Sequence, residues 1–287
     1  MPALATEAPP VAFVFITHHL AREILREYEK IEASVAGLGT AWFLYQGETS
    51  RPSQKLQISN LEIVRQSDLQ ALNYRMPFDS ILPGSSHFPL LEFYRKHREY
   101  RDYWLIEYDV RFSGDWRTFF AEFASVRADF LAAHFRRYHE EPEWPFWALT
   151  HPVRSIALED RMRCFHPICR LSNAALACIS AAHQDGWCGH DELLPTTLLH
   201  VNGFSFADFG GEGEFVPPGM QNKYYTSTPP NPQGLLESGT YRFRPLHLRM
   251  GREKDKLYHP VKPQFITMRS NIRSLIKRIL GKKGAAK

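Results

Sequence analysis

The hydrophobic positions of the N-terminal third of the chain fall into short runs separated by polar stretches of helical period. Residues 11–17 (VAFVFIT) form an uninterrupted apolar run, typical of a strand buried on both faces of a parallel sheet. A helical pattern follows over 20–31, and further strand-like runs cover 40–45 (TAWFLY) and 61–64 (LEIV). A short helix is expected over 68–72. This order predicts the start of a doubly wound α/β sheet.

The remaining elements continue the same alternation. They are a helix over 88–100, a strand over 103–107, a helix over 116–123 with Asp115 as N-cap, strands over 128–132 and 164–170, a helix over 174–183 with Ser172 or Asn173 as cap, and a helix over 191–199. Pro, Gly, Trp and Asn punctuate 140–147 and 210–239, which predicts loops. The chain is therefore expected to form one α/β domain over 11–265, a GT-A-like (Rossmann-like) mostly parallel sheet with flanking helices, after a flexible N-terminus (1–10) and before a basic segment (266–287).

Composition narrows the class of protein. The 287 residues include 44% hydrophobic residues, enough to bury a sizeable core, and a net charge of +4 is too small to predict nucleic-acid binding. No two of the four cysteines form a CxxC pair, so reduced thiols are expected: Cys164, Cys169, Cys178 and Cys188. No run approaches the ~18 apolar residues of a membrane span, and no leader pattern is visible. The expected location is cytoplasmic.

An acidic pair follows the strand-like run 103–107. Period-two alternation places Glu107 and Asp109 on one face of the chain, about 6–7 Å apart. Ligands of open α/β sheets gather at the carboxyl ends of strands, and two carboxylates there can hold a divalent cation that neutralises a diphosphate. The alternative interpretation is a surface acidic turn balanced by Arg111 or Arg117.

A second acidic pair follows a predicted helix end. Gly186 is a plausible C-cap, and the segment WCGHDE then leads to Asp191 and Glu192, with Pro195 near the start of the next helix. A helix N-terminus favours ionised carboxylates, and an ionised carboxylate beside a cleft can act as a general base for a sugar hydroxyl. The alternative is that these acids only cap the helix and complement its dipole.

The strand-borne acidic pair and the later Gly-His-Asp-Glu helix start together resemble the GT-A glycosyltransferase superfamily. Residues 189–199 are similar to the D-E-x-x-x-x-T-L-L segment of core-2 and I-branching N-acetylglucosaminyltransferases, and 104–116 and 256–262 are similar to a group of polysaccharide-synthesis proteins. The resemblance implies a nucleotide-sugar donor, a glycan or lipid-linked glycan acceptor, and an inverting mechanism with Glu192 as the base beside Asp191. Glu107 replaces the first Asp of the DxD motif, which leaves metal dependence open.

The resemblance and the neighbouring residues also suggest roles for other side chains. Expected donor-binding residues are Thr17, His18, Glu107, Asp109, Arg111, Lys256 and Lys262, and expected acceptor-binding residues are Arg170, Trp187 and His190. The expected cofactor is Mn²⁺ or Mg²⁺ on Glu107, Asp109 and His247, with His259 and His200 ranked below His247. The alternative is a metal-independent mechanism in which Lys and Arg side chains hold the diphosphate.

The C-terminal segment has a pattern of its own. Residues 269–287 place five apolar residues at helical spacing among Lys and Arg, as in helices that dock on anionic membranes. Packing on the domain is the alternative. Placement at the inner face of a membrane would suit an enzyme of surface polysaccharide biosynthesis that extends lipid-linked glycans. Two other functions stay open: a metal-dependent nucleotide-sugar hydrolase and a non-catalytic carbohydrate- or nucleotide-binding protein on the same fold.

Overall fold

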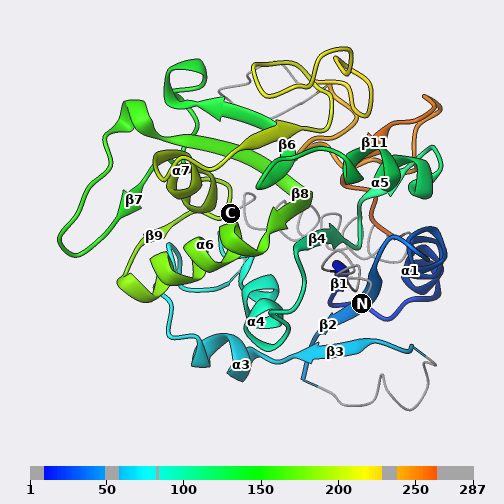
Figure 1. Cartoon of the computed structure of the whole chain (residues 1–287), viewed down its shortest axis with the longest axis horizontal. Coiled ribbons are helices and arrows are strands. Elements are labelled where there is room, and N and C mark those ends of the chain that lie inside the picture. Colours follow the sequence, from blue (N-terminus) through cyan, green and yellow to red (C-terminus); the bar gives the residue numbers. More distant parts are fainter. Residues whose placement is uncertain (1–9, 49–57, 82–83, 228–237, 264–287) are drawn as a thin grey trace, which may run out of the picture.

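The computed structural model describes residues 10–48, 58–81, 84–227 and 238–263 (Figure 1). The predictions made for residues 1–9 and for the basic segment 266–287 lie outside the described residues. Within the described residues, no helix is long and apolar enough to cross a membrane.

A seven-stranded sheet forms the centre of the described chain. Its strand order is β10-β6-β8-β4-β1-β2-β3, and β8 runs antiparallel to both of its neighbours while the other pairs are parallel. The predicted mostly parallel α/β sheet is therefore confirmed. The strands are β1 (Val11–Thr17), β2 (Thr40–Gln46), β3 (Leu61–Val64), β4 (Asp102–Glu107), β6 (Phe130–Arg137), β8 (Met162–Ser172) and β10 (Phe206–Asp208).

Helices cover both faces of this sheet (Figure 1). They are α1 (Arg22–Ser34), α3 (Gln66–Ala71), α4 (Phe88–Lys96), α5 (Trp116–Ala124), α6 (Asn173–Asp185) and α7 (Leu194–Val201). Alternate residues of β1 enter two different cores. Phe13 and Phe15 pack in one core with α1 and α5, whereas Val14 and Ile16 pack in the other with α4 and α6. The uninterrupted apolar run of β1 is explained by this burial on both faces.

Three predicted helix ends are confirmed by their hydrogen bonds. The Asp115 carboxylate accepts from the Thr118 N–H at 2.8 Å, and the Ser172 hydroxyl accepts from the Ala175 N–H at 3.1 Å. Gly186 ends α6 with a left-handed φ of 104°. A side chain at this φ would be strained by roughly 1–2 kcal/mol, which accounts for glycine at this position.

Three predicted elements differ from the structure. The helix expected over 88–100 ends at Lys96, with His97 as its C-cap. The strand expected over 128–132 extends to Arg137 as β6, because it pairs along most of the 11-residue β8. The helix expected over 191–199 begins only at Leu194, because the carbonyl of His190 accepts from the N–H groups of Leu193 and Leu194 and closes a separate turn. Asp191 and Glu192 consequently lie in this turn and not in the helix.

The strand order reverses between β1 and β4, where open α/β sheets are expected to form a crevice. The chain leaves β1 towards β2 on one side of the sheet, while β4 pairs with β1 on the other side. In open α/β sheets such a reversal of strand order is the usual ligand site, at the carboxyl ends of the strands. Thr17 ends β1 and Glu107 ends β4 at this edge.

Candidate functional site

Three potential metal ligands converge where β4 ends. They are Glu107, Asp109 and His259, whose ligand atoms all lie within 4.8 Å of one another. The His259 Nε2 atom lies 3.6 Å from Asp109 Oδ1 and 4.0 Å from Glu107 Oε2. The structure therefore places the predicted acidic pair beside a histidine that is distant from it in the sequence.

Backbone hydrogen bonds fix this convergence. The Tyr108 N–H donates to the Ile16 carbonyl at 3.0 Å, which ties the turn after β4 to β1. The Val261 N–H donates to the Asp109 carbonyl at 2.8 Å. Just before Val261 in the sequence, β11 (Leu257–Tyr258) pairs antiparallel with β5 (Arg111–Phe112). This small sheet and the Val261 bond place His259 beside the two carboxylates.

The hydrogen bonds of His259 assign its tautomer. Its Nδ1 lies 2.8 Å from the Arg242 carbonyl, so Nδ1 carries a proton, and in the neutral ring Nε2 presents a lone pair to the carboxylates. Burial lowers the pKa of His259, although Asp109 acts in the opposite direction. Asp109 Oδ1 is buried and finds no hydrogen-bond donor in the described part of the chain. Lone pairs that face one another without a donor are the arrangement that a bound cation would satisfy.

The charges of the two carboxylates support the same conclusion. Burial, and then the negative charge of Asp109, raise the pKa of Glu107 to about 8. Burial also opposes ionisation of Asp109, but His259 and Lys262 together lower the pKa of its carboxyl. A divalent cation between the two would favour the ionised form of Glu107. The residues present therefore fit a Mn²⁺ or Mg²⁺ ion.

Lys262 brings a fixed positive charge to the same edge. Its Nζ lies 2.5 Å from Asp109 Oδ2 and donates to the Tyr108 hydroxyl at 3.1 Å. The edge of the Tyr108 ring contacts His18 and His19, which follow β1. Of the predicted donor residues, Thr17, His18, Glu107, Asp109 and Lys262 thus lie at the carboxyl-terminal edge of β1 and β4. His19 is the second member of the His18-His19 pair that follows the first strand-like run of the sequence, whereas Tyr108 has no sequence signal that distinguishes it from other aromatic residues.

Three other predicted site residues make contacts of a different kind. Arg111 donates to the Tyr108 and Val110 carbonyls at 2.6 and 2.7 Å, so it stabilises the turn after β4. Its hydrogen bonds therefore go to backbone carbonyls and not to the carboxylates of Glu107 and Asp109. Lys256 donates to the carbonyls of Asn222 and Lys223 and holds a loop. His247, the expected third metal ligand, has its Nε2 2.8 Å from the Thr240 carbonyl, and His259 occupies the position beside the carboxylates instead. The alternative partner for the acidic pair, Arg117, donates to the Ser34 and Ala36 carbonyls.

The second acidic pair separates into two different environments. Asp191 is buried, accepts from the Ser86 N–H at 2.9 Å, and lies 2.9 Å from His190 Nδ1. Burial opposes its ionisation, but the hydrogen bond and charge of His190 hold the pKa of Asp191 well below its usual range. A carboxylate of such low basicity is a weak general base. Asp191 therefore orients His190 and does not cap α7.

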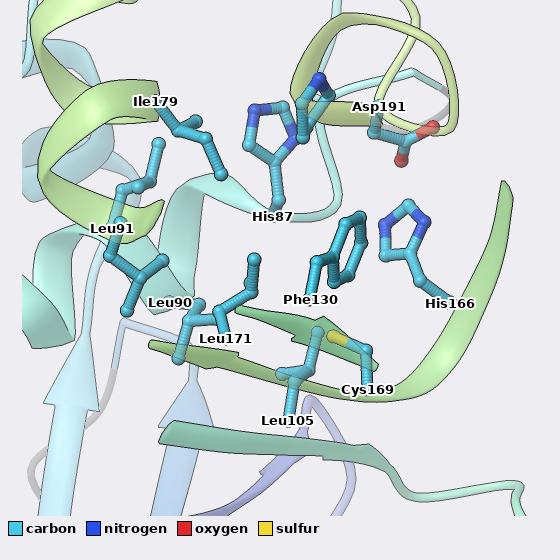
Figure 2. Close-up of a pocket in the computed structure, with 12 residues that line it drawn as sticks. His87, Leu90, Leu91, Leu105, Phe130, His166, Cys169, Leu171, Ile179 and Asp191 are labelled. Carbon is cyan, nitrogen blue, oxygen red and sulfur yellow. The ribbon is translucent and has the colours of Figure 1, made fainter. Parts of the chain in front are cut away.

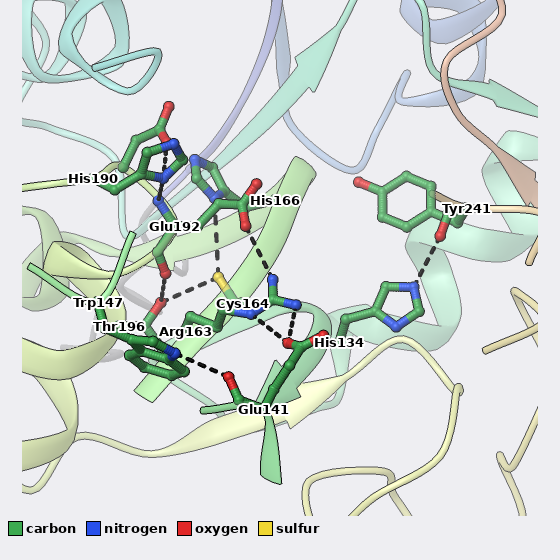
Figure 3. A network of polar contacts seen from close by, with 11 residues as sticks. His134, Glu141, Trp147, Arg163, Cys164, His166, His190, Glu192, Thr196 and Tyr241 are labelled. Carbon is green, nitrogen blue, oxygen red and sulfur yellow. Dashed lines mark hydrogen bonds and ion pairs between the residues drawn. The ribbon is translucent and has the colours of Figure 1, made fainter. Parts of the chain in front are cut away.

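Glu192 belongs to an ion-pair network around Arg163 (Figure 3). Its carboxylate lies 3.0 Å from the Arg163 guanidinium, which also contacts the Glu141 carboxylate at 2.7 Å and stacks over Trp144 at 4.9 Å. The Glu192 side chain is more exposed than that of Asp191. Neither Arg163 nor Glu141 has a sequence signal, because β8 and the loop after β6 bring them to Glu192 from distant positions.

The two acidic pairs interact electrostatically. The negative charges of Asp191 and Glu192 contribute to the raised pKa of Glu107, after burial and Asp109. The sequence predicted both pairs, and in the folded chain their charges interact.

The predicted acceptor residues are placed unequally. Arg170 is buried and donates to the carbonyls of Phe123, Val126 and Ala128, so its role is structural. Trp187 is also buried, in a small core under α7. Only His190 lies with the acidic residues. Its ring stacks on Phe146 at 4.5 Å and meets the edge of Trp144 at 5.4 Å, and Phe78 completes this partly exposed aromatic cluster.

Comparisons with known proteins add little to this geometry. No protein-family model and no curated protein sequence matches the chain. A solved structure described as a glucose-1-phosphate thymidylyltransferase from Bacillus anthracis, in complex with sucrose, is similar over 70% of this chain and 88% of its own, with 11% identity and a TM-score of 0.39. Likeness at this level does not establish a common function.

A pocket lies beside Asp191 (Figure 2). His166 and Asp191 gather on one side of it, and Leu90, Leu91 and Ile179 line the other. One lining residue, His87, has its Nε2 atom 2.8 Å from the Nε2 atom of His183, and the Nδ1 atoms of both rings are buried without a hydrogen-bond partner among the described residues. The shared Nε2 contact requires one ring to donate and the other to accept, so at least one ring is neutral.

This histidine pair predicts acid sensitivity. Burial lowers the pKa of His183 to about 4 and also lowers that of His87, whereas both rings titrate near 6.5 when unfolded. The unfolded chain therefore binds more protons, and the free energy of unfolding should fall as the pH drops from about 6.5 towards about 4. Urea unfolding between about pH 7 and about pH 5 measures this slope. His183→Gln should reduce the slope, and an unchanged slope would contradict the explanation.

Proposed function

We propose that the protein transfers a sugar from a nucleotide-sugar donor to a hydroxyl group of a glycan or lipid-linked glycan. The observation that carries this proposal is the convergence of Glu107, Asp109 and His259 at the carboxyl ends of β1 and β4, where one buried carboxylate oxygen has no donor among the described residues. A site of this kind at the reversal of strand order suits a cation-bound diphosphate.

The donor side follows from these contacts. Glu107, Asp109 and His259 would hold Mn²⁺ or Mg²⁺, and the bound ion supplies positive charge that stabilises the departing nucleoside diphosphate. Lys262 adds a second positive charge beside Asp109 and is the group that would serve a metal-independent mechanism. His18 and Tyr108 offer ring surfaces at the end of β1 for the nucleotide.

The acceptor side is assigned to the second acidic pair. Glu192 would accept the proton of the acceptor hydroxyl while the hydroxyl oxygen bonds to the anomeric carbon and the nucleoside diphosphate departs. Arg163 positions the Glu192 carboxylate, and Asp191 orients His190. The aromatic cluster of Phe78, Trp144 and Phe146 would pack against the apolar face of the acceptor sugar. Surface polysaccharide biosynthesis is the process in which we place this reaction.

Donor binding gives the most direct test of the proposal. UDP, GDP or CMP with Mn²⁺ should raise the melting temperature, because a ligand at about 100 times its Kd stabilises the folded state by about 2.7 kcal/mol. The measurement is a thermal melt with each nucleotide, with Mn²⁺, with Mg²⁺ and with a chelator. Stabilisation by nucleotide in the presence of chelator would favour the Lys262 mechanism. Absence of a shift with every nucleotide would refute donor binding.

Transfer and hydrolysis are separated by a second measurement. With a labelled nucleotide sugar, a transferase should release nucleotide faster when the correct glycan acceptor is added. Release at the same rate with and without every acceptor would identify a hydrolase instead.

A further inference from the structure

An exposed apolar loop lies next to the site and takes no part in it. Within residues 243–250, the fractional exposures are 54% for Phe243, 37% for Leu246, 71% for Leu248 and 43% for Met250. These are four of the nine large hydrophobic side chains exposed in the described ranges, gathered within eight residues. Single exposed hydrophobic residues are ordinary, but a cluster of this density marks an interaction surface.

Basic side chains surround these apolar residues. Arg244, Arg249, Arg252 and Lys254 are all exposed, and the only acidic residues between 243 and 255 are Glu253 and Asp255. The exposed charges of this stretch therefore sum to +2. The Arg244 guanidinium lies 4.8 Å from the Phe243 ring, so apolar and cationic groups alternate on one short loop.

The loop is built on the chain segment that carries two site residues. The Arg242 N–H donates to the His259 carbonyl at 3.2 Å, and the His247 N–H donates to the Pro260 carbonyl at 2.9 Å. Bridges between Tyr241 and His259, and between His247 and Val261, continue this pairing. The loop, orange in Figure 1, is therefore anchored to the segment that carries His259 and Lys262.

We propose that the 243–250 loop docks the protein on an anionic lipid bilayer. Phe243, Leu246, Leu248 and Met250 would enter the boundary between headgroups and acyl chains, while the arginines contact lipid phosphates. A bilayer interface accepts apolar and cationic groups together without a complementary shape, which matches their alternation on an irregular loop. Docking through this loop would require neither the C-terminal segment nor sugar transfer. It would bring the carboxyl ends of β1 and β4 to the membrane surface, where lipid-linked acceptors lie.

Vesicle cosedimentation of the full chain tests the proposal. Wild-type protein should sediment with phosphatidylcholine vesicles that contain phosphatidylserine, less with phosphatidylcholine alone, and less at high salt. The triple variant Leu246→Asp/Leu248→Asp/Met250→Asp should bind the phosphatidylserine vesicles at least ~10-fold more weakly. Arg249→Gln/Arg252→Gln should lose most of the dependence on phosphatidylserine.

Controls separate docking from folding and from general surface effects. Val153→Asp changes a side chain that is 86% exposed on another loop, and its vesicle binding should equal that of wild type. Melting temperatures report the fold of each variant, and the milder Leu248→Ser replaces the triple variant if the latter unfolds. Wild-type binding retained by a folded loop variant would overturn the proposal. So would failure of wild type to bind phosphatidylserine vesicles, and loop-dependent self-association without vesicle binding would assign the surface to a protein partner.

Discussion

Replacing Asp109 with Asn is expected to lower kcat/KM for sugar transfer by about 10²–10³-fold, the usual cost of losing one preorganised charge contact. One oxygen of this carboxylate faces Glu107 and His259 and has no donor within the described ranges, and the other contacts Lys262. Asparagine keeps the shape of the side chain but removes the charge that both contacts use. Initial rates measured against Mn²⁺ concentration should also show a higher concentration for half-maximal activity.

The matched control for this variant is Asp115→Asn. Asp115 caps α5 just beyond the same strand end and is exposed. Asn caps helices about as well as Asp, so activity and stability should both stay near wild-type values. Wild-type metal dependence in Asp109→Asn would contradict the proposed cation site. If Asp109→Asn loses most of its activity while the wild-type protein stays fully active in chelator, Lys262 and not a metal ion would stabilise the departing diphosphate. Lys262→Gln should then be inactive.

Replacing Glu192 with Gln is expected to lower kcat by about 10²–10⁴-fold while nucleotide binding stays unchanged, because a general base acts on the chemical step and not on the donor. The carboxylate lies on the Arg163 guanidinium, and glutamine can still accept a hydrogen bond there. Steady-state rates with the acceptor and nucleotide-dependent melting shifts measure the two effects separately.

Glu141→Gln is the control for the Arg163 network. Glu141 contacts the same guanidinium and is buried, so its loss should lower stability more than turnover. Equal losses of kcat in the Glu141 and Glu192 variants would show that Glu192 acts only by holding Arg163. Full activity of Glu192→Gln with its acceptor would remove the base assignment.

The sequence by itself determined the class of fold and both acidic pairs. Apolar runs such as 11–17 report burial on two faces, and this local signal is strong because the five residues from Ala12 to Ile16 all lie in one core or the other. Helix ends at Asp115, Ser172 and Gly186 were also predictable, because capping depends on residues within one turn of the helix.

Tertiary structure alone decided which side chains serve the site. His247 and His259 lie on either side of β11 in the sequence, and only the pairing of β11 with β5 and the Val261–Asp109 hydrogen bond bring His259 to the carboxylates. Arg170 and Trp187 look available in the sequence but are buried, whereas Arg163 reaches Glu192 from β8. Local sequence fixes backbone conformation through short-range sterics and hydrogen bonds, but contacts between distant segments depend on strand register and packing, which no short motif encodes.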